Sequence, residues 1–583
     1  MEEPQSDPVY ASHPNMTWKR HFNGKIIRDE LYFPWSARDK AKDAQSKDPV
    51  YEDQEAAEGL PGTHYNRNEE DFNEDGTPRT VWGQNGKAWP VMTAGAGLFS
   101  DGYVNNSMST VTTVLKRIYG EEYSKSRKSQ ILPAIVFVGT VVGMLVFGYV
   151  ADYHSRKLGM IISTMILIIF TILCSGSWGA GGKKNMDGML AALITYRFFM
   201  GIGLGGEYPA GSVACAEASA IMGRGTRNRW FILFTNFMID FGFVCSAFVP
   251  CVLWWIFHDK HLQAVWRLTL GLGAIPPLGL FYLRTKFKEN PSFMKNNFKR
   301  TRFPYVLAIR YYGVRLACVS LIWFIYDWAS YSYGLYASSI LDNLNPNESL
   351  IKNFGYTTII NLWYLPGSFL GAICADYIGP RLALIVGVTL QAVVGYIMAG
   401  IYEHLSKPSN VAGFICMYGV FLALGEFGPG DQIGLIASKT CATPIRGQYY
   451  AIAAAIGKIG AFVGTYCFPA IQKSVGHGDP NSVAGQQGPF WVSCSMNILS
   501  AVLAYFVLPS ITQETIQDED RLFREYLIAH GFDISLMGDA EFAEGRGGSS
   551  EDSPEYPTEY KEGQEPHHSS DEPELPAKLE AVQ

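Results

Sequence analysis

Long apolar runs separated by short polar segments fill the chain between residues 89 and 510. A hydrocarbon core about 30 Å thick is crossed by roughly 20 apolar residues in a helix, and about twelve runs reach that length. They lie near residues 90–115, 131–151, 158–179, 188–215, 230–256, 264–284, 311–340, 357–375, 381–402, 411–436, 448–472 and 490–509. The pattern predicts an all-α membrane protein with twelve transmembrane helices in a lipid bilayer.

Polar segments mark the ends and the middle of this apolar region. Residues 1–88 and 511–583 form acidic polar tails, and a basic linker, residues 286–310, separates two six-helix segments, 89–285 and 311–510. Because cytosolic loops carry an excess of Lys and Arg, the linker is predicted to face the cytosol. An even number of spans then places both termini in the cytosol.

A second basic segment lies in a loop that this topology places outside. Its members are Lys116, Arg117, Lys125, Arg127 and Lys128. Their charge either attracts anionic solutes or is an incidental feature of the surface. Another outer loop contains the sequon Asn347-Glu348-Ser349, so Asn347 is a predicted glycosylation site.

A cluster of apolar residues beyond the last run is spaced as on one face of a short helix. Its members are Leu522, Phe523, Tyr526, Leu527 and Ile528. With Gly531 as its stop, this segment is predicted to be an amphipathic helix. It either lies on the inner leaflet, docks on the loops, or frays.

Composition narrows the classes of protein that fit. The 583 residues are 48% hydrophobic and 17% charged, with a net charge of −7 whose excess lies in the tails. This is not the pattern of a nucleic-acid-binding surface. The ten cysteines show no Cys–Cys or Cys–His spacing of a metal site. No catalytic triad or nucleotide-binding loop stands out, so neither an enzyme nor a cofactor is predicted.

A short motif occurs once in each half of the apolar region. An Ala-Asp-Tyr sequence ends the second and the eighth runs, at Asp152 and Asp376, 376 − 152 = 224 positions apart, and basic residues follow each copy. The residues of the two copies are Gly148, Asp152, Arg156, Lys157, Asp376 and Arg381. Internal duplication is a hallmark of transporters built from two related six-helix halves.

The first copy resembles the G-x-x-x-D-[RK]-x-G-R-[RK] loop of the major facilitator superfamily. The resemblance implies the fold of that superfamily, with two pseudo-symmetric six-helix halves. It also implies a gating latch, in which the Asp lies at a helix N-terminus and the basic residues hold nearby carbonyls and carboxylates.

Charged residues lie inside the apolar runs, among them Asp101, Arg197, Glu207, Asp327 and Lys458. A charge at the bilayer centre costs on the order of 2.5–3.5 kcal/mol, so these side chains are expected to face one another or a water-filled cavity. The chain is therefore predicted to contain an ionic site in the middle of its helices.

Motifs around these charges resemble those of the phosphate:proton symporters of the superfamily. The fourth run contains R-x-x-x-G, beginning at Arg197, and G-G-[DE]-Y-P, which includes Glu207 and Tyr208. The seventh run contains W-x-x-x-D-x-x-x-Y, whose three named residues share one helix face. They are Trp323, Asp327 and Tyr331. Over nearly the whole membrane region the chain is most similar to the fungal glycerophosphoinositol permeases.

The first run departs from the symporter pattern. Asp101 matches the first Asp of D-x-x-D, but Val104 occupies the position of the second. This removes one candidate proton site and leaves inorganic phosphate as an uncertain substrate.

The resemblance implies a proton-coupled importer of a glycerophosphodiester such as glycerophosphoinositol, with phosphate as a further candidate. It would act as a monomer at the fungal plasma membrane by alternating access. The implied substrate-binding residues are Lys458, Tyr208, Trp323, Tyr331 and Asp327, with Lys458 on the phosphate. The implied proton-coupling residues are Asp101, Glu207, Asp327 and Arg197, the last in a supporting role that orients either Glu207 or a helix contact.

Other interpretations of the same residues stay open. Lys458 could form a structural ion pair with Asp327 or Glu207, and substrate could break that pair. The scaffold also suits an exporter of another small organic metabolite. A nutrient-sensing receptor that binds a solute without moving it is the third possibility.

Overall fold

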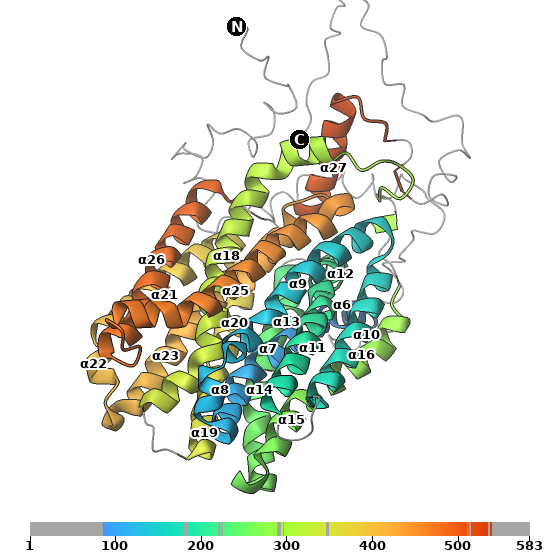
Figure 1. The fold of residues 1–583 in the computed structure, drawn as a ribbon. Coiled ribbons are helices and arrows are strands. Elements are labelled where there is room, and N and C mark those ends of the chain that lie inside the picture. Colours follow the sequence, from blue (N-terminus) through green and yellow to red (C-terminus); the bar gives the residue numbers. More distant parts are fainter. Residues whose placement is uncertain are drawn as a thin grey trace, which may run out of the picture.

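The described part of the chain is a bundle of long helices (Figure 1). This computed structural model describes residues 85–179, 185–219, 222, 226–288, 293–294, 297–344, 349–509, 511, 515–534 and 537–538. Every regular element in these ranges is helical, which confirms the predicted all-α class. Asn347, most of both tails and part of the basic linker lie outside the described residues.

The helices divide into two sets in chain order. The first comprises α6 (Asn85–Gly95), α7 (Phe99–Tyr119), α8 (Glu121–Lys125), α9 (Arg127–Tyr153), α10 (Arg156–Ser175), α11 (Met186–Gly206), α12 (Val213–Ser219), α13 (Arg227–Phe234), α14 (Asn236–Phe257), α15 (Leu262–Leu272) and α16 (Ile275–Thr285). The second comprises α18 (Tyr305–Leu344), α19 (Leu350–Leu362), α20 (Tyr364–Tyr377), α21 (Pro380–Gly400), α22 (Tyr402–Leu405), α23 (Val411–Gly425), α24 (Asp431–Lys439), α25 (Arg446–Val475), α26 (Val483–Val507) and α27 (Thr515–Ala529).

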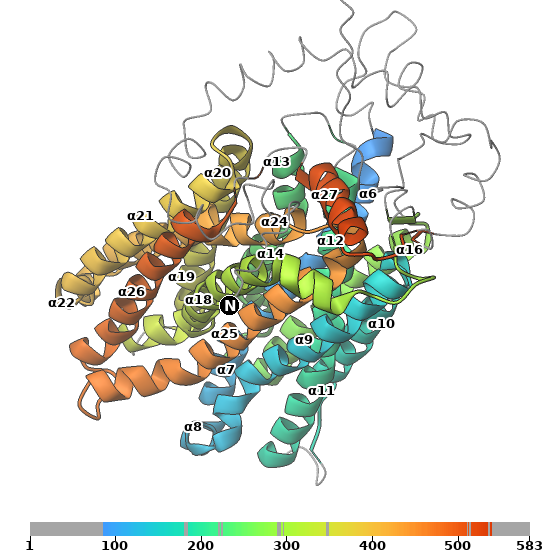
Figure 2. The ribbon, with the colours of Figure 1, turned by 90° about the horizontal axis from the view of Figure 1, so that it is seen from above.

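Four helices lie where the two sets meet. Seen from above, α7 and α14 of the first set and α18 and α25 of the second lie between the outer helices of the two sets (Figure 2). The pairs α25–α9, α18–α7 and α14–α19 pack across this boundary. Side chains on these helices are therefore placed to build a site that both halves share.

Eleven of the described helical segments are long and apolar enough to cross a membrane. The remaining expected span is the first in the chain, Asn85–Tyr119. It packs along α14 but is more polar than the others. Its buried polar side chains include Asp101, Asn105, Asn106, Ser107, Ser109 and Thr110. Because they face protein rather than lipid, α7 is an inner helix of the bundle.

Two wide helical turns interrupt the fourth and the tenth spans. A π-helical turn, Glu207–Ser212, joins α11 to α12, and another, Glu426–Gly430, joins α23 to α24. Each contains a proline, which lacks the N–H that a regular α-turn needs. Each turn begins with a glutamate that is 1% exposed, so the two halves match in structure as well as in the Ala-Asp-Tyr motif.

The helix beyond the last span docks on the bundle. Phe523, Tyr526 and Leu527 of α27 are buried in a cluster that includes Tyr311 and Tyr312 of α18. The helix ends at Ala529, and Gly531 follows with φ +71°. Of the three arrangements that the sequence allowed for this segment, namely lying on the inner leaflet, docking and fraying, the structure shows docking.

Polar contacts fix the position of α27. Arg315 Nη1 lies 2.8 Å from Glu519 Oε1, and the Thr443 hydroxyl donates to Asp520 Oδ2 at 2.7 Å. Removal from solvent raises the pKa of the Asp520 carboxyl, and the nearby Arg446 guanidinium opposes that rise. α27 is therefore held to the N-terminal part of α18 and to the short turn, Thr443–Ile445, that precedes α25.

We predict that Gly201→Ala destabilises the protein by about 1–3 kcal/mol, because the added methyl group overpacks a helix contact. A Cβ at Gly201 would lie 2.3 Å from the Val136 carbonyl oxygen of α9. Thermal denaturation in detergent, followed by size-exclusion chromatography, measures the effect. The matched control is Gly355→Ala, where a Cβ meets nothing within 4 Å. Equal melting temperatures for the two variants would contradict this account of the α9–α11 contact.

Candidate functional site

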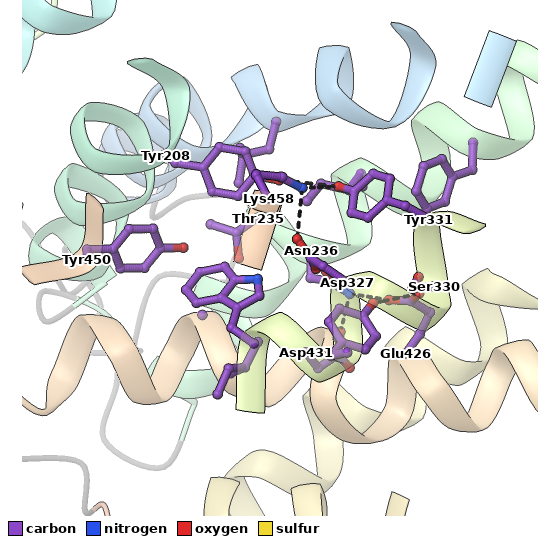
Figure 3. Close-up of a pocket in the computed structure, with 18 of the residues that line it drawn as sticks. Tyr208, Thr235, Asn236, Asp327, Ser330, Tyr331, Glu426, Asp431, Tyr450 and Lys458 are labelled. Carbon is purple, nitrogen blue, oxygen red and sulfur yellow. Dashed lines mark hydrogen bonds and ion pairs between the residues drawn. The ribbon is translucent and has the colours of Figure 1, made fainter. Parts of the chain in front are cut away.

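A buried lysine lies between two carboxylates at the centre of the bundle. Lys458, in the middle of α25, is 1% exposed. Its Nζ lies 3.4 Å from Asp327 Oδ2 of α18 and 3.5 Å from Asp101 Oδ2 of α7 (Figure 3). Asp327 belongs to the same half as the lysine and Asp101 to the other half, so this ammonium ties the halves together.

Tyrosines complete the surroundings of the ammonium. Lys458 Nζ donates to the Tyr331 hydroxyl, which in turn donates to Asp101 Oδ2 at 2.5 Å. The Tyr208 hydroxyl donates to the same carboxylate oxygen at 2.8 Å. The ammonium also lies 3.8 Å from the ring centroid of Tyr331 and 4.9 Å from that of Tyr208. The cation therefore has π faces as well as oxygens around it.

Small residues beside Lys458 bring α18 and α25 close together. A Cβ at Gly457 would lie 2.5 Å from Trp323 Cδ1, and a Cβ at Gly460 would lie 2.2 Å from the Phe324 carbonyl oxygen. Only glycine fits at either position without displacing α18. The Gly-Lys-x-Gly segment of α25 therefore explains how a lysine in this helix reaches Asp327.

A small cavity lies beside the lysine. Its lining includes all five predicted substrate-binding residues, namely Lys458, Tyr208, Trp323, Asp327 and Tyr331. Asp101 contacts the lysine but does not line the cavity. The structure thus brings together, around one cavity, side chains from the fourth, seventh and eleventh spans.

A second group of buried carboxylates lies at the other end of the cavity. Asp240 of α14, Glu426 and Asp431 are each at most 1% exposed. Asn236 Nδ2 donates to Glu426 Oε2 at 3.0 Å and to Asp431 Oδ1 at 2.9 Å, and Tyr326 donates to Glu426 Oε1 at 2.9 Å. In the part of the chain that the structure describes, no Lys or Arg forms an ion pair with these three carboxylates.

The sequence motifs did not indicate this second group, although one signal was present. Glu426 opens the π-turn of the tenth span, at the place that Glu207 holds in the fourth. Asp240, like the five charges singled out above, lies within an apolar run. A comparison of the two halves would have pointed to Glu426, and the charge within an apolar run would have pointed to Asp240.

Glu207 lies outside both of these carboxylate groups and is bound by a residue that the motifs did not include. Arg284, at the end of α16, donates from Nη1 and Nη2 to the two oxygens of Glu207, each at 2.6 Å. The Thr164 hydroxyl donates to Oε1 at 3.1 Å. Glu207 does not line the cavity, and its bidentate partner is Arg284.

Arg197 does not reach Glu207 in this structure. Its Nε donates to the Leu132 carbonyl oxygen of α9 at 3.1 Å, and its side chain is fully buried. Of the two supporting roles expected for Arg197, the structure therefore shows the helix contact, and it is Arg284 that orients Glu207.

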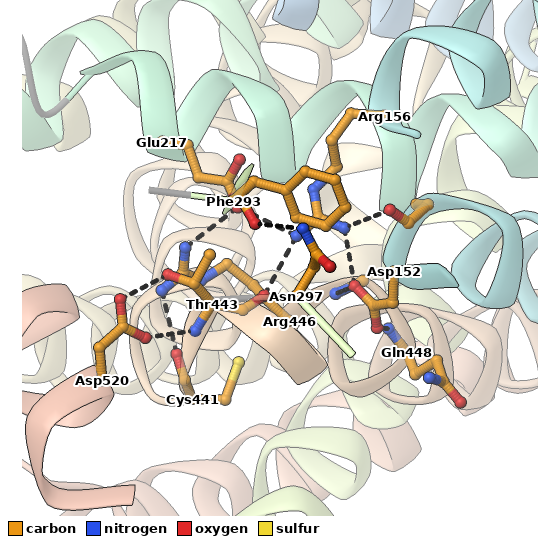
Figure 4. Close-up of polar contacts among 12 residues, drawn as sticks. Asp152, Arg156, Glu217, Phe293, Asn297, Cys441, Thr443, Arg446, Gln448 and Asp520 are labelled. Carbon is orange, nitrogen blue, oxygen red and sulfur yellow. Dashed lines mark hydrogen bonds and ion pairs between the residues drawn. The ribbon is translucent and has the colours of Figure 1, made fainter. Parts of the chain in front are cut away.

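Asp152 lies at the N-terminus of α25. Its Oδ1 accepts from the Gly447 amide at 2.8 Å and its Oδ2 from the Gln448 amide at 2.7 Å (Figure 4). The positive end of the helix dipole stabilises a carboxylate there. A Cβ at Gly148 would lie 2.5 Å from Ala451 Cβ, so glycine allows this close approach of α9 and α25.

Two arginines share one glutamate beside this contact. Arg156 lies 2.7 Å from Asp152 and 3.0 Å from Glu217 Oε1. Arg446 of the other half reaches the same Glu217 oxygen at 3.2 Å. Lys157 follows in the first turn of α10 and is half-buried. The network joins α9, α12 and α25 at the end of the bundle where α27 docks.

The second copy of the motif makes the related contact on the other side. The Arg229 amide, in the first turn of α13, donates to Asp376 Oδ1 at 3.4 Å, and Arg229 Nε lies 3.3 Å from Oδ2. Arg381 instead donates to the carbonyl oxygens of Ala504 and Tyr505 at 3.2 and 2.5 Å. Each half therefore places a motif aspartate at the first turn of a helix from the other half.

Comparison with known sequences identifies similar proteins. The chain matches the model of the family described as Sugar (and other) transporter over residues 88–308 and 313–523. It is 51% identical over 456 residues to the glycerophosphocholine permease GIT4 of Candida albicans, covering 78% of this chain and 84% of that protein. It is 50% identical over 455 residues to the major glycerophosphoinositol permease GIT3 of the same organism, covering 77% and 84%.

Comparison with solved structures supports the fold. The proton:xylose symporter XylE from E. coli, bound to 6-bromo-6-deoxy-D-glucose, superimposes with a TM-score of 0.60 at 19% identity. The match covers 75% of this chain and 98% of that one. At this level of identity the similarity concerns the arrangement of helices.

We predict that Glu207→Gln and Arg284→Gln each destabilise the protein by about 3–5 kcal/mol, because each leaves a buried charge without its partner. The double variant should lose less than the sum of the two single losses. Thermal denaturation of the four proteins in detergent provides the cycle, with the exposed Glu403→Gln as control. Additive losses would show that the pair does not interact energetically.

Proposed function

The chain belongs to the Sugar (and other) transporter family of the major facilitator superfamily, and we propose that it is a proton-coupled importer of glycerophosphodiesters. Members of this family are transporters rather than enzymes, and the helices described above make this chain a multi-pass membrane protein. The observation that carries the proposal is the buried ammonium of Lys458, which faces a cavity between the two halves.

The charge of the central site suits an anion that enters together with a proton. Lys458 contributes one positive charge, while Asp101 and Asp327 contribute two negative charges when ionised. A phosphodiester carries one negative charge and would be repelled unless one carboxylate accepted a proton. Bound proton and bound anion thus leave the net charge of the site unchanged, which links the two binding events.

The same contacts supply a route to alternating access. Asp101 lies in one half and Lys458 in the other, at 3.5 Å. When a phosphate oxygen replaces the Asp101 carboxylate as the partner of the ammonium, the halves lose one of the contacts that join them. Substrate binding would in this way favour rocking of the halves around a central site.

The second carboxylate group offers a further place for a proton. Asn236 Nδ2 donates to Asp240 Oδ2 of one half at 3.4 Å and to Glu426 Oε2 of the other half at 3.0 Å. Two carboxyl groups held by one amide group lie close together, and like charges that close disfavour double ionisation, so one of the two would hold a proton. We propose that this carboxylate group takes up and releases protons at the end of the cavity opposite Lys458.

The identity of the substrate follows from the similar proteins and the chemistry of the site. GIT4 and GIT3 are named for glycerophosphocholine and glycerophosphoinositol, two head groups on the same phosphodiester. The phosphate is the part that both solutes share and that Lys458 would bind. We place the protein at the fungal plasma membrane with both termini in the cytosol, where an inward proton gradient would drive accumulation.

We predict that Lys458→Ala reduces uptake of labelled glycerophosphocholine and glycerophosphoinositol by about 100-fold or more. Loss of one partner of a buried charge-assisted contact costs about 2–5 kcal/mol. Uptake is measured at pH 5 in cells that express tagged protein, with the amount at the cell surface quantified. The control is Lys473→Ala, an exposed lysine of the same helix. Unchanged uptake in Lys458→Ala would exclude this lysine as the phosphate ligand.

We predict that Asp327→Asn uncouples solute movement from the proton gradient. The substitution removes one of the two carboxylates beside Lys458, so the site has the charge of its protonated form and binds the anion without needing a proton. Accumulation at pH 5 should fall to the level seen at pH 7, while counterflow of the phosphodiester in proteoliposomes persists. The exposed Asp479→Asn serves as control. Retention of acid-stimulated accumulation in Asp327→Asn would assign the proton to another carboxylate, and Glu426→Gln would then be the next variant.

A further inference from the structure

Arg197 is a buried cation with unused hydrogen-bond donors. Its side chain is fully buried in α11, and its one hydrogen bond joins Nε to the Leu132 carbonyl oxygen. Neither Nη1 nor Nη2 has a hydrogen-bond partner among the described residues. The titratable groups close enough to act on it electrostatically are Cys174 and Tyr123, neither of which is an acid at neutral pH.

Burying a charged side chain without a counter-ion costs free energy, so such a side chain is expected to bind a partner in at least one state. A guanidinium does not give up its proton in a protein, so the charge persists. Charged side chains inside membrane spans are retained mostly for function and pair with something in at least one state. The acidic side chains of α7 and α11, Asp101 and Asp187, lie instead against Lys458 and Lys128. The guanidinium therefore lacks a counter-ion from these helices.

One neighbour of Arg197, Tyr123, lies at the end of the bundle opposite the latch. Tyr123 belongs to α8, which lies at the far end of the bundle from α27 (Figure 1). Its hydroxyl is buried and has no hydrogen-bond partner among the described residues. Tyr123 also lies within electrostatic range of Tyr336 of α18, whose hydroxyl donates to the Thr465 carbonyl oxygen of α25. Tyr123 therefore lies between the neighbourhood of Arg197 and a residue of the other half.

Basic side chains surround the same end of the bundle. Lys116 and Arg117 close α7 and are exposed, and Arg127 at the start of α9 is exposed as well. Positive potential at the mouth of a cleft raises the local concentration of anions. The basic loop, which central binding at Lys458 does not explain, lies at the same end of the bundle as Tyr123.

We propose that Arg197 and Tyr123 form a second anion-binding site, which takes the phosphate group of the solute before it reaches Lys458. The two free Nη groups present N–H donors in the planar fork that matches two oxygens of a phosphate, and the Tyr123 hydroxyl supplies a third donor. The site is reached when the halves separate at this end. Its phosphodiester ligand rests on the proposed function, whereas its preference for an oxyanion rests on Arg197 itself.

The test measures anion binding in the absence of the central lysine. Full-length Lys458→Ala protein is purified, and its melting temperature is measured with glycerophosphocholine, with inorganic phosphate and with choline chloride. We expect both phosphate compounds, but not choline chloride, to raise the melting temperature. The rise should vanish in Lys458→Ala/Arg197→Gln, persist in weaker form in Lys458→Ala/Arg197→Lys, and shrink in Lys458→Ala/Tyr123→Phe.

Controls separate binding from folding. Arg267 is half-buried and its two Nη groups donate to the carbonyl oxygens of Ser175 and Ser177, so Lys458→Ala/Arg267→Gln should keep the full anion effect. If Arg197→Gln lowers the melting temperature but leaves the anion-induced rise intact, the residue is structural and the proposal is wrong. An anion effect lost entirely in Lys458→Ala alone also overturns it.

Uptake provides the second measurement. With Lys458 present, Arg197→Lys should raise the external KM for glycerophosphocholine about tenfold while the maximal rate changes little, because the first binding step is weakened. A fall in maximal rate with KM unchanged contradicts the proposal. If phosphate but not glycerophosphocholine produces the Arg197-dependent stabilisation, the substrate assignment fails while the anion site stands.

Discussion

The ammonium of Lys458, held between carboxylates from both halves, is the interaction on which the central architecture depends. It is too costly to bury alone, and neither Asp101 nor Asp327 could be buried there without it. The Tyr331 and Tyr208 hydroxyls add hydrogen bonds that fix the Asp101 carboxylate. The glycines of α25 give the lysine its reach, so backbone packing and electrostatics specify the same place in the bundle.

The helices and the central charged residues could be predicted because both follow from the cost of placing polar groups in the hydrocarbon core of a bilayer. An apolar run long enough to span a bilayer becomes a helix, and a charge within it must find a partner inside the protein. The four-residue spacing of Trp323, Asp327 and Tyr331 further indicated one shared face. Lys458 and Asp327 therefore emerged as a site before any contact was known.

The partners of buried charges could not be predicted in the same way. Arg284 lies at the end of a span, where an arginine ordinarily meets water, yet it binds Glu207 from 77 positions away in sequence. Arg197, nearer to Glu207 along the chain, points to α9 instead. Such pairings depend on how whole helices rotate and tilt, which local patterns do not encode. The docking of α27 likewise required knowledge of the surface that receives it.

The π-turn of the fourth span fixes the rotation of the helix that follows it. A π-turn holds one residue more than the α-turn it replaces. If Glu207–Ser212 wound as a regular α-helix with the same number of residues, α12 would turn by about 100° relative to α11. Glu217 would then face away from Arg156 and Arg446. The extra residue of the wide turn therefore sets the direction in which Glu217 faces.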